Sequence, residues 1–147
     1  MNRKLMFSSE RDDWCTPQSF FDELNKEFGF TLDPCATKLS AKCENFYTKK
    51  DDGLSKDWYG EVVFVNPPYG REMKKWVNKC FEESKKPNTK VVMLIPARTD
   101  TTYFHEYIYK KAEIRFIRGR VKFIKPDTST DEKDFTSAPF PSMVVVF

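Results

Sequence analysis

Residues 62–70 read VVFVNPPYG: four apolar residues run directly into an amide, two prolines, a tyrosine and a glycine. A strand that is apolar on both faces belongs in the centre of a covered sheet. Pro67 and Pro68 fix two φ angles and remove two backbone N–H groups, so the chain leaves this strand through a stiff corner. The stretch therefore predicts a central strand that ends in a rigid turn.

Patterns on both sides of this stretch predict helices that alternate with strands. Thr16 and Pro17 suit the cap and the first position of a helix, which Gly29 can end. Apolar residues also recur at helical spacing over residues 73–81. Further strands are expected at residues 30–33, 91–96, 114–117, 121–124 and 142–147, a helix around residues 103–108, and a mobile polar loop at residues 125–136. This order predicts a three-layer α/β fold with a mostly parallel sheet.

Length and composition are those of one globular domain. The chain has 147 residues, of which 39% are hydrophobic and 16% aromatic, so global disorder is excluded and one domain over residues 1–147 is expected. No apolar run approaches the roughly 20 residues of a membrane span, and the N-terminal residues lack the apolar stretch of a secretion signal. We therefore expect a cytoplasmic protein, as a monomer or a weak dimer.

The cysteines and the single histidine do not form a metal-binding pattern. Cys15, Cys35, Cys43 and Cys80 lie far apart, and His105 has no second histidine to pair with. A zinc site usually needs closely spaced ligand pairs. Reduced, mostly buried thiols and no metal are expected.

Charge is unevenly distributed along the chain. Residues 71–125 carry 15 basic and 6 acidic side chains, a net charge of +9 against +3 for the whole chain, so the remainder carries −6. A basic segment is compatible with a polyanionic partner. Solvated helix faces rich in lysine and glutamate account for it equally well.

The corner after the central strand is the strongest candidate site. In open α/β sheets, ligands bind just beyond the carboxyl ends of the strands. The amide oxygen of Asn66 and the carbonyls around the prolines form a cluster of acceptors, and Tyr69 adds a flat aromatic surface. Such a group suits a planar ligand that bears an amino group. The alternative is a rigid turn in which Asn66 satisfies nearby backbone.

The N-P-P-Y sequence after a strand resembles the catalytic signature of amino methyltransferases. The chain as a whole resembles the small DNA adenine methyltransferases of bacteriophages and prophages. The matching segments are WCTP at 14–17, FGFTLDPCA at 28–36, DGLSKDW at 52–58, NPPYG at 66–70, IPARTD at 95–100, GRVKF at 119–123 and APFPS at 138–142. The resemblance implies a Rossmann-like methyltransferase fold with an antiparallel C-terminal strand and no separate target-recognition domain.

Enzymes of this family transfer a methyl group from S-adenosylmethionine to the exocyclic amino group of adenine. The resemblance implies that Asn66 and the Pro67 carbonyl accept the amino hydrogens, while Pro68 completes the corner. Tyr69 would stack on an adenine that has been flipped out of the duplex. The protein then contributes orientation and electrostatics, without a covalent intermediate.

The resemblance also implies where the cofactor binds. Asp33 matches an acidic residue near the methionine part of the cofactor, and Asp52 matches a position that contacts its adenine. The sequence lacks the glycine-rich G-x-G that is common after the first strand of other methyltransferases. An N-terminal element is expected to close over the cofactor. The implied cofactor-binding residues are Thr16, Pro17, Asp33, Pro34, Cys35, Ala36, Asp52 and Asn66.

Four cations are the candidates for DNA binding. Arg118, Arg120 and Lys122 lie in or next to the GRVKF segment, and Arg98 follows the second apolar strand. Contacts of such groups with phosphates make binding strongly salt-dependent. Solvent-facing strand residues are the alternative. Sequence preference is expected to come from residues 125–136 or from this basic strand region.

Two other functions remain open at this point. N-P-P-Y also occurs in enzymes that methylate glutamine side chains or adenine in RNA, so the motif by itself does not fix the acceptor. An inactive nucleic-acid-binding remnant of the same fold is a third possibility, and the absent G-x-G favours it. Among these, the end-to-end resemblance favours DNA adenine.

Overall fold

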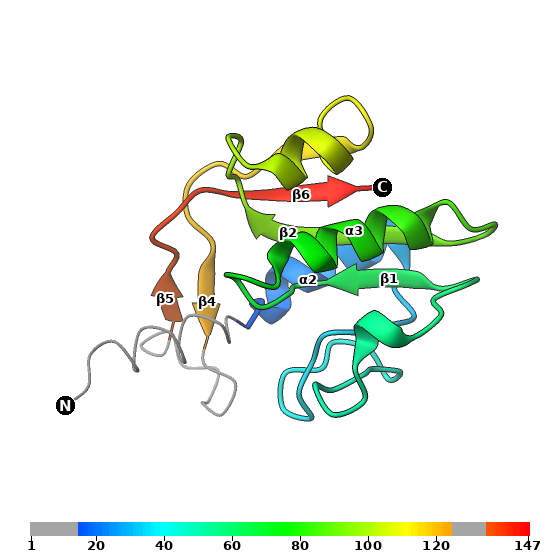
Figure 1. Cartoon of the computed structure of the whole chain (residues 1–147). Helices are drawn as coiled ribbons and strands as arrows, with labels where there is room; N and C mark the ends of the chain where they lie inside the picture. The colour runs from blue at the N-terminus through cyan, green and yellow to red at the C-terminus, as the bar shows by residue number, and fades with distance from the viewer. Residues whose placement is uncertain (1–14, 125–134) are drawn as a thin grey trace.

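The computed structural model describes residues 15–124 and 135–147 (Figure 1). The helical elements are α2 (Gln18–Phe28), the short turn η1 (Gly53–Ser55), α3 (Met73–Ser84) and the π-helical turn η2 (Phe104–Ile108). The strands are β1 (Val62–Val65), β2 (Lys90–Pro96), β3 (Glu113–Phe116), β4 (Lys122–Ile124), β5 (Phe135–Ser137) and β6 (Ser142–Val146). The fold is mixed α/β, as the alternating patterns predict.

The main sheet has four strands in the order β1-β2-β6-β3. β1 and β2 pair in parallel, and β6 runs antiparallel to both of its neighbours, so β1, β2 and β3 share one direction. Beside β1, Leu32 forms a parallel bridge with Val63, and Asp33 forms another with Phe46. The strand expected at residues 30–33 is thus reduced to two bridging residues, and the last strand is antiparallel as expected.

Successive residues of a strand point to opposite sides of a sheet. Because β1 is apolar on both sides, a helix packs on each of its faces. Val63 and Val65 lie in the same buried cluster as Trp76 and Val77 of α3. Phe64, which points the other way, packs with Phe21 of α2. Figure 1 shows α3 and α2 on opposite sides of the sheet. The two apolar faces of β1 therefore account for its central burial.

Two local expectations are wrong. Thr16 does not cap α2: the residue before the helix is Pro17, and among the described residues no side-chain hydrogen bond caps the helix. Residues 135 and 136, which were expected in a mobile loop, belong to β5 and pair with β4 outside the main sheet. Residues 125–134 of that expected loop, together with Trp14, lie outside the described residues.

The four cysteines lie in two environments. Cys15 and Cys80 are buried, whereas Cys35 and Cys43 are half-buried. Burial raises the pKa of Cys43 to about 12 and that of Cys80 well above its ordinary value. Within residues 15–124 and 135–147, no three candidate ligands come together for a metal ion. In the same ranges no helix has the length and apolarity needed to cross a membrane.

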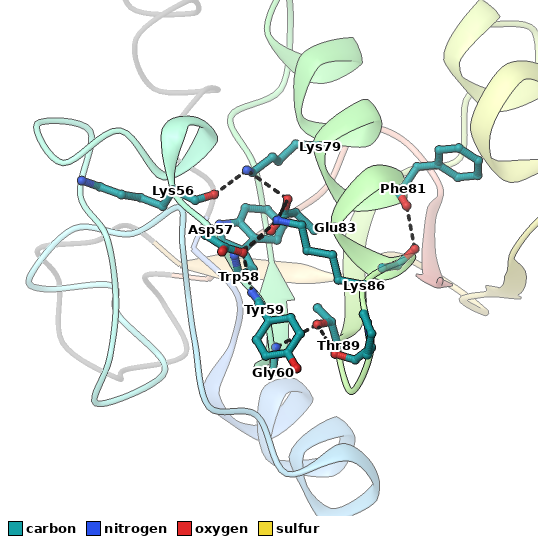
Figure 2. A network of polar contacts seen from close by, with 12 residues as sticks. Lys56, Asp57, Trp58, Tyr59, Gly60, Lys79, Phe81, Glu83, Lys86 and Thr89 are labelled. Atoms are coloured by element: carbon teal, nitrogen blue, oxygen red, sulfur yellow. Dashed lines mark hydrogen bonds and ion pairs between the residues drawn. The ribbon is translucent and has the colours of Figure 1, made fainter.

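A buried carboxylate joins α3 to the segment that precedes β1 (Figure 2). Glu83 is only 5% exposed, and its Oε1 accepts the backbone N–H of Trp58 at 2.6 Å. Lys86 and Lys79 contact Oε2 at 2.7 and 3.4 Å. Burial alone would raise the pKa of Glu83, but the hydrogen bonds from Lys86 and Trp58 and the charge of Lys79 outweigh it and lower the pKa.

Trp58 connects Glu83 to η1. Its side chain is fully buried and stacks on Trp76 of α3, with ring centroids 6.4 Å apart. Its Nε1–H donates to the carbonyl of Gly53 at 3.1 Å, and the Lys79 ammonium lies 5.2 Å from its ring centroid. The position of η1 therefore depends on contacts with α3.

Replacing Glu83 should destabilise the fold strongly. Glu83→Ala leaves the Trp58 N–H and the Lys79 ammonium without their buried partner, so we expect the free energy of unfolding to fall by about 3–5 kcal/mol in urea denaturation. The control is Glu82→Ala, because Glu82 is exposed and has one ion pair, at 3.6 Å from Lys85. That variant should change stability by less than about 1 kcal/mol. An equal loss of stability in the two variants would contradict the anchoring role of Glu83.

Candidate active site

The amide of Asn66 is held by two hydroxyl groups where β1 ends. Its Nδ2 donates to Thr16 Oγ1 at 3.0 Å, and its Oδ1 accepts the hydroxyl of Tyr69 at 3.0 Å. Fifty residues separate Thr16 from Asn66, so the N-terminal segment completes the corner. The expected alternative, in which Asn66 bonds the neighbouring backbone of a simple turn, does not describe these two side-chain contacts.

Tyr69 is packed among aromatic rings. Its ring meets Phe140 edge-on at a centroid distance of 5.4 Å and Phe123 at 6.2 Å. Burial, with a smaller contribution from Tyr103, raises the pKa of Tyr69 far above its ordinary value. The hydroxyl therefore keeps its proton and acts as the donor to Asn66.

Two cavities lie against this corner. The larger, of about 680 Å³, is lined by Asn66 and Pro68, and the smaller, of about 440 Å³, is lined by Tyr69. Because Tyr69 bonds Asn66, the corner contributes wall to both cavities. Pro67 is buried and lines neither of them. The larger cavity also contains most of the residues predicted for the cofactor: Thr16, Asp33, Pro34, Cys35, Ala36 and Asp52. Pro17 is buried and does not line this cavity.

Asp33 presents a buried carboxylate to the larger cavity. It is 4% exposed, and its two oxygens accept backbone N–H groups from Lys42 at 3.0 Å and Cys35 at 3.4 Å. Burial raises its pKa to about 6, although both N–H groups and the Lys42 charge act in the opposite direction. The carboxylate is therefore poorly compensated in the ligand-free chain, and a cationic ligand would stabilise its charged form.

The loop of Asp52 packs against the loop of Asp33. A Cβ atom on Gly53 would lie 2.1 Å from the carbonyl oxygen of Pro34, so only glycine permits this close approach. Asp52 itself is exposed and has a left-handed backbone conformation, with φ 60°. The absent G-x-G thus has a partial counterpart, because a glycine from a different loop allows the two backbones to meet beside the cavity.

Sequence reasoning missed several residues of the larger cavity. Lys42 is half-buried there; its backbone N–H bonds Asp33, while its ammonium donates to Gln18 at 3.2 Å. Burial lowers the pKa of Lys42. The other missed residues are Cys15, Thr37, Ser40, Thr48, Lys49, Gly53, Leu54, Phe64, Glu72 and Trp76. The sequence spacing gave no signal for Lys42, because only the folded loop returns it to Asp33.

The predicted DNA-binding cations fall into two groups. Arg98 lines the smaller cavity, with its guanidinium 6.0 Å from the centroid of Phe140. Arg118, Arg120 and Lys122 are exposed on and before β4. Their neighbour Arg115 instead forms a bidentate pair with Glu27, with both distances at 2.7 Å.

Comparison with known proteins identifies similar chains. The family model for DNA N-6-adenine-methyltransferase (Dam) matches residues 4–147. The DNA N-6-adenine-methyltransferase of Haemophilus phage HP1 is 32% identical over 150 residues, which cover 100% of this chain and 84% of the phage protein. The protein of the same name from Escherichia phage T1 is 36% identical over 74% of this chain and 46% of its own length. The putative methyltransferase YfdM of Escherichia coli K12 is 38% identical over 40% of this chain and 71% of its own length.

Proposed function

This chain belongs to the family of DNA N-6-adenine-methyltransferases, and on that premise we propose that Asn66 and Tyr69 form its catalytic corner. The prediction of an adenine-specific DNA methyltransferase is confirmed, because the family and both phage relatives carry that activity in their names. The chain therefore methylates the exocyclic amino group of adenine in DNA. Methyl transfer by this family implies S-adenosylmethionine as the donor.

The larger cavity fits S-adenosylmethionine. Its volume of about 680 Å³ lies in the ordinary range for small-molecule sites. When bound, the cofactor supplies an electrophilic methyl group on a sulfonium. Trp76, Leu54 and Phe64 give the cavity apolar wall, while Asp33 and Lys42 give it charges of both signs. That combination matches a ligand with an aromatic base at one end and an amino acid at the other.

Asp33 and Lys42 bind the two charges of the amino-acid end. The Asp33 carboxylate pairs with the ammonium of the cofactor, because a cation relieves the desolvation that raises its pKa to about 6. Lys42 also lines the cavity, and its ammonium, which donates to Gln18 in this structure, pairs with the carboxylate of the cofactor. Asp52, next to Leu54 on another part of the wall, contacts the adenosine end.

The arrangement of β1 and Asp33 supports a Rossmann-like fold. The parallel bridge of Leu32 with Val63 aligns Asp33 with β1, so Asp33 and Asn66 follow strands of the same direction. In such sheets the ligand lies at the carboxyl ends of the strands. Asp33, proposed to bind the cofactor, and Asn66, proposed as catalytic, thus lie at the same edge of the sheet.

The smaller cavity receives the flipped adenine. Tyr69, Tyr103 and Phe140 provide aromatic surface, on which stacking contributes roughly 1–3 kcal/mol per base. An amide oxygen has two lone pairs, so Asn66 Oδ1 can accept the adenine amino group in addition to the Tyr69 hydroxyl. The Pro67 carbonyl is the predicted acceptor of the second amino hydrogen, although Pro67 is buried and lines neither cavity in the structure. These acceptors direct the nitrogen lone pair toward the methyl group, so the residues act by positioning.

Removing the amide of Asn66 should abolish methyl transfer without emptying the cofactor site. For Asn66→Ala we expect the rate on adenine-containing DNA to fall by at least about 100-fold, in the range found when a transition-state donor or acceptor is removed. Tritium transfer from labelled S-adenosylmethionine measures the rate, and calorimetry measures cofactor affinity, which should change less than about threefold. Wild-type turnover in this variant would exclude the proposed role.

The charge pairing predicts how ligands discriminate between two variants. Lys42→Met should lower the affinity for S-adenosylhomocysteine by about tenfold. The affinity for a decarboxylated analogue should stay unchanged, because the analogue keeps only the ammonium. Asp33→Asn should weaken both ligands. Methylthioadenosine, which carries neither charge, serves as the control and should bind all three proteins alike. If Lys42→Met weakened all ligands equally, the pairing with the carboxylate would be wrong.

The pH dependence of binding follows from Asp33. Its pKa of about 6 means that the carboxylate loses its charge as pH falls through 6, so S-adenosylhomocysteine affinity should fall below that pH. The free energy of unfolding of the ligand-free chain should instead rise as pH falls through 6, because the folded state holds the proton more tightly than the unfolded state. This group therefore destabilises the chain above pH 6 and ceases to do so near pH 4. Asp33→Asn should flatten both profiles between these values.

Exposed cations next to β4 bind the DNA backbone. Phe123 of β4 contacts Tyr69, which places this strand beside the catalytic corner. For Arg120→Gln we expect the slope of log affinity against log salt to fall by about 1, in anisotropy titrations with duplex DNA. Arg115→Gln is the matched control, since Arg115 is engaged with Glu27 and should leave the slope unchanged. The interface is misplaced if the control alters the slope and Arg120→Gln does not.

A further inference from the structure

The Asn66 amide needs a partner that keeps its oxygen on the side of Tyr69. We infer that Thr16 is a positioning residue for the reaction, because its hydroxyl fixes the orientation of the catalytic amide. The inference rests on the proposed role of Asn66, and it gives Thr16 a role beyond the helix cap and the cofactor contact that the sequence predicted. Thr16 does not line the smaller cavity proposed for the base; it acts through Asn66 Nδ2, which donates to its Oγ1 at 3.0 Å.

Thr16 is itself rigidly placed. It is 2% exposed and lies between two residues with backbone hydrogen bonds. On one side, Cys15 pairs with Ile124 of β4 through bonds of 3.2 and 3.1 Å. On the other side, the Pro17 carbonyl accepts the N–H of Phe21 and starts α2. The hydroxyl is therefore a fixed acceptor.

The orientation matters because the two ends of an amide have opposite hydrogen-bonding properties. With Nδ2 toward Thr16, the oxygen of Asn66 faces Tyr69 and can accept an amino group. A 180° rotation would direct the NH₂ group at the adenine amino group, and two donors would then face each other. The same rotation would deprive the Tyr69 hydroxyl of its acceptor among the rings of Phe123 and Phe140.

A threonine hydroxyl can also donate, and cofactor binding would settle which role it takes. Thr16 lines the larger cavity together with Asp33 and Lys42. A ligand acceptor at that wall takes the Thr16 hydrogen and leaves only its lone pairs for Asn66. The Asn66 nitrogen must then face Thr16, so the cofactor-loaded site holds the amide in the reactive orientation.

Three variants separate positioning from general packing. Thr16→Val keeps the shape of the side chain and removes the acceptor, and Thr16→Ser restores the hydroxyl. Thr89→Val is the control, because the Thr89 hydroxyl likewise accepts one N–H, that of Gly60 at 2.9 Å (Figure 2), but Thr89 lines neither cavity.

Single-turnover methylation at saturating cofactor and DNA isolates the chemical step from changes in affinity. We expect Thr16→Val to lower the rate constant by about tenfold, equivalent to about 1.4 kcal/mol of activation free energy. Thr16→Ser should remain within about threefold of the wild type, and Thr89→Val should match it. A wild-type rate constant for Thr16→Val would overturn the inference, as would an equal loss in Thr16→Ser.

A second measurement does not depend on activity. In nitrogen-15 NMR spectra, the side-chain NH₂ signal of Asn66, assigned by its loss in Asn66→Ala, should exchange slowly with water in the wild type and rapidly in Thr16→Val. Unchanged exchange would overturn the contact itself. If the wild type showed the protected signal but methylated no DNA, the proposed function would fail while the contact between Thr16 and Asn66 stood.

Discussion

Two hydrogen bonds of 3.0 Å on the Asn66 amide, one at each end, hold together the corner on which the proposed mechanism depends. They can form only because β1 is buried on both faces and its exit is stiffened by Pro67 and Pro68. The chain is then directed along one path, with Tyr69 turned back toward the amide. Thr16 accepts a hydrogen bond from the other end of the amide.

The proposed cofactor site brings together residues that the fold keeps buried and close to one another. Burial of Asp33 is energetically unfavourable, because its carboxylate is desolvated even without a ligand. The neighbouring loop, which contains Gly53, is supported from α3, where Glu83 binds Trp58 and Trp58 binds Gly53. The contact of Gly53 with Pro34 joins the two supports. The site is thus built from loops, but each loop is fixed to a buried element of the fold.

The sequence predicted the strands and helices whose apolar residues repeat regularly, and a local motif led to the corner after β1 that we propose as catalytic. It could not predict contacts that depend on folding across long separations. Thr16 was expected to cap α2, yet its hydroxyl bonds a side chain 50 residues away. Lys42 gave no signal, because only the return of its loop brings it to Asp33. Glu83 looked like one more surface charge on a helix rich in glutamate and lysine, and its burial follows from Trp58.

The account assigns different ligands to two cavities that share the corner of Asn66 and Tyr69. The most direct test is a crystal structure of the chain with S-adenosylhomocysteine and adenine-containing DNA. It should show the homocysteine charges at Asp33 and Lys42, and an extruded adenine with its amino nitrogen about 2.7–3.2 Å from Asn66 Oδ1. An adenine bound away from Tyr69, or a cofactor outside the cavity of Asp33, would contradict it.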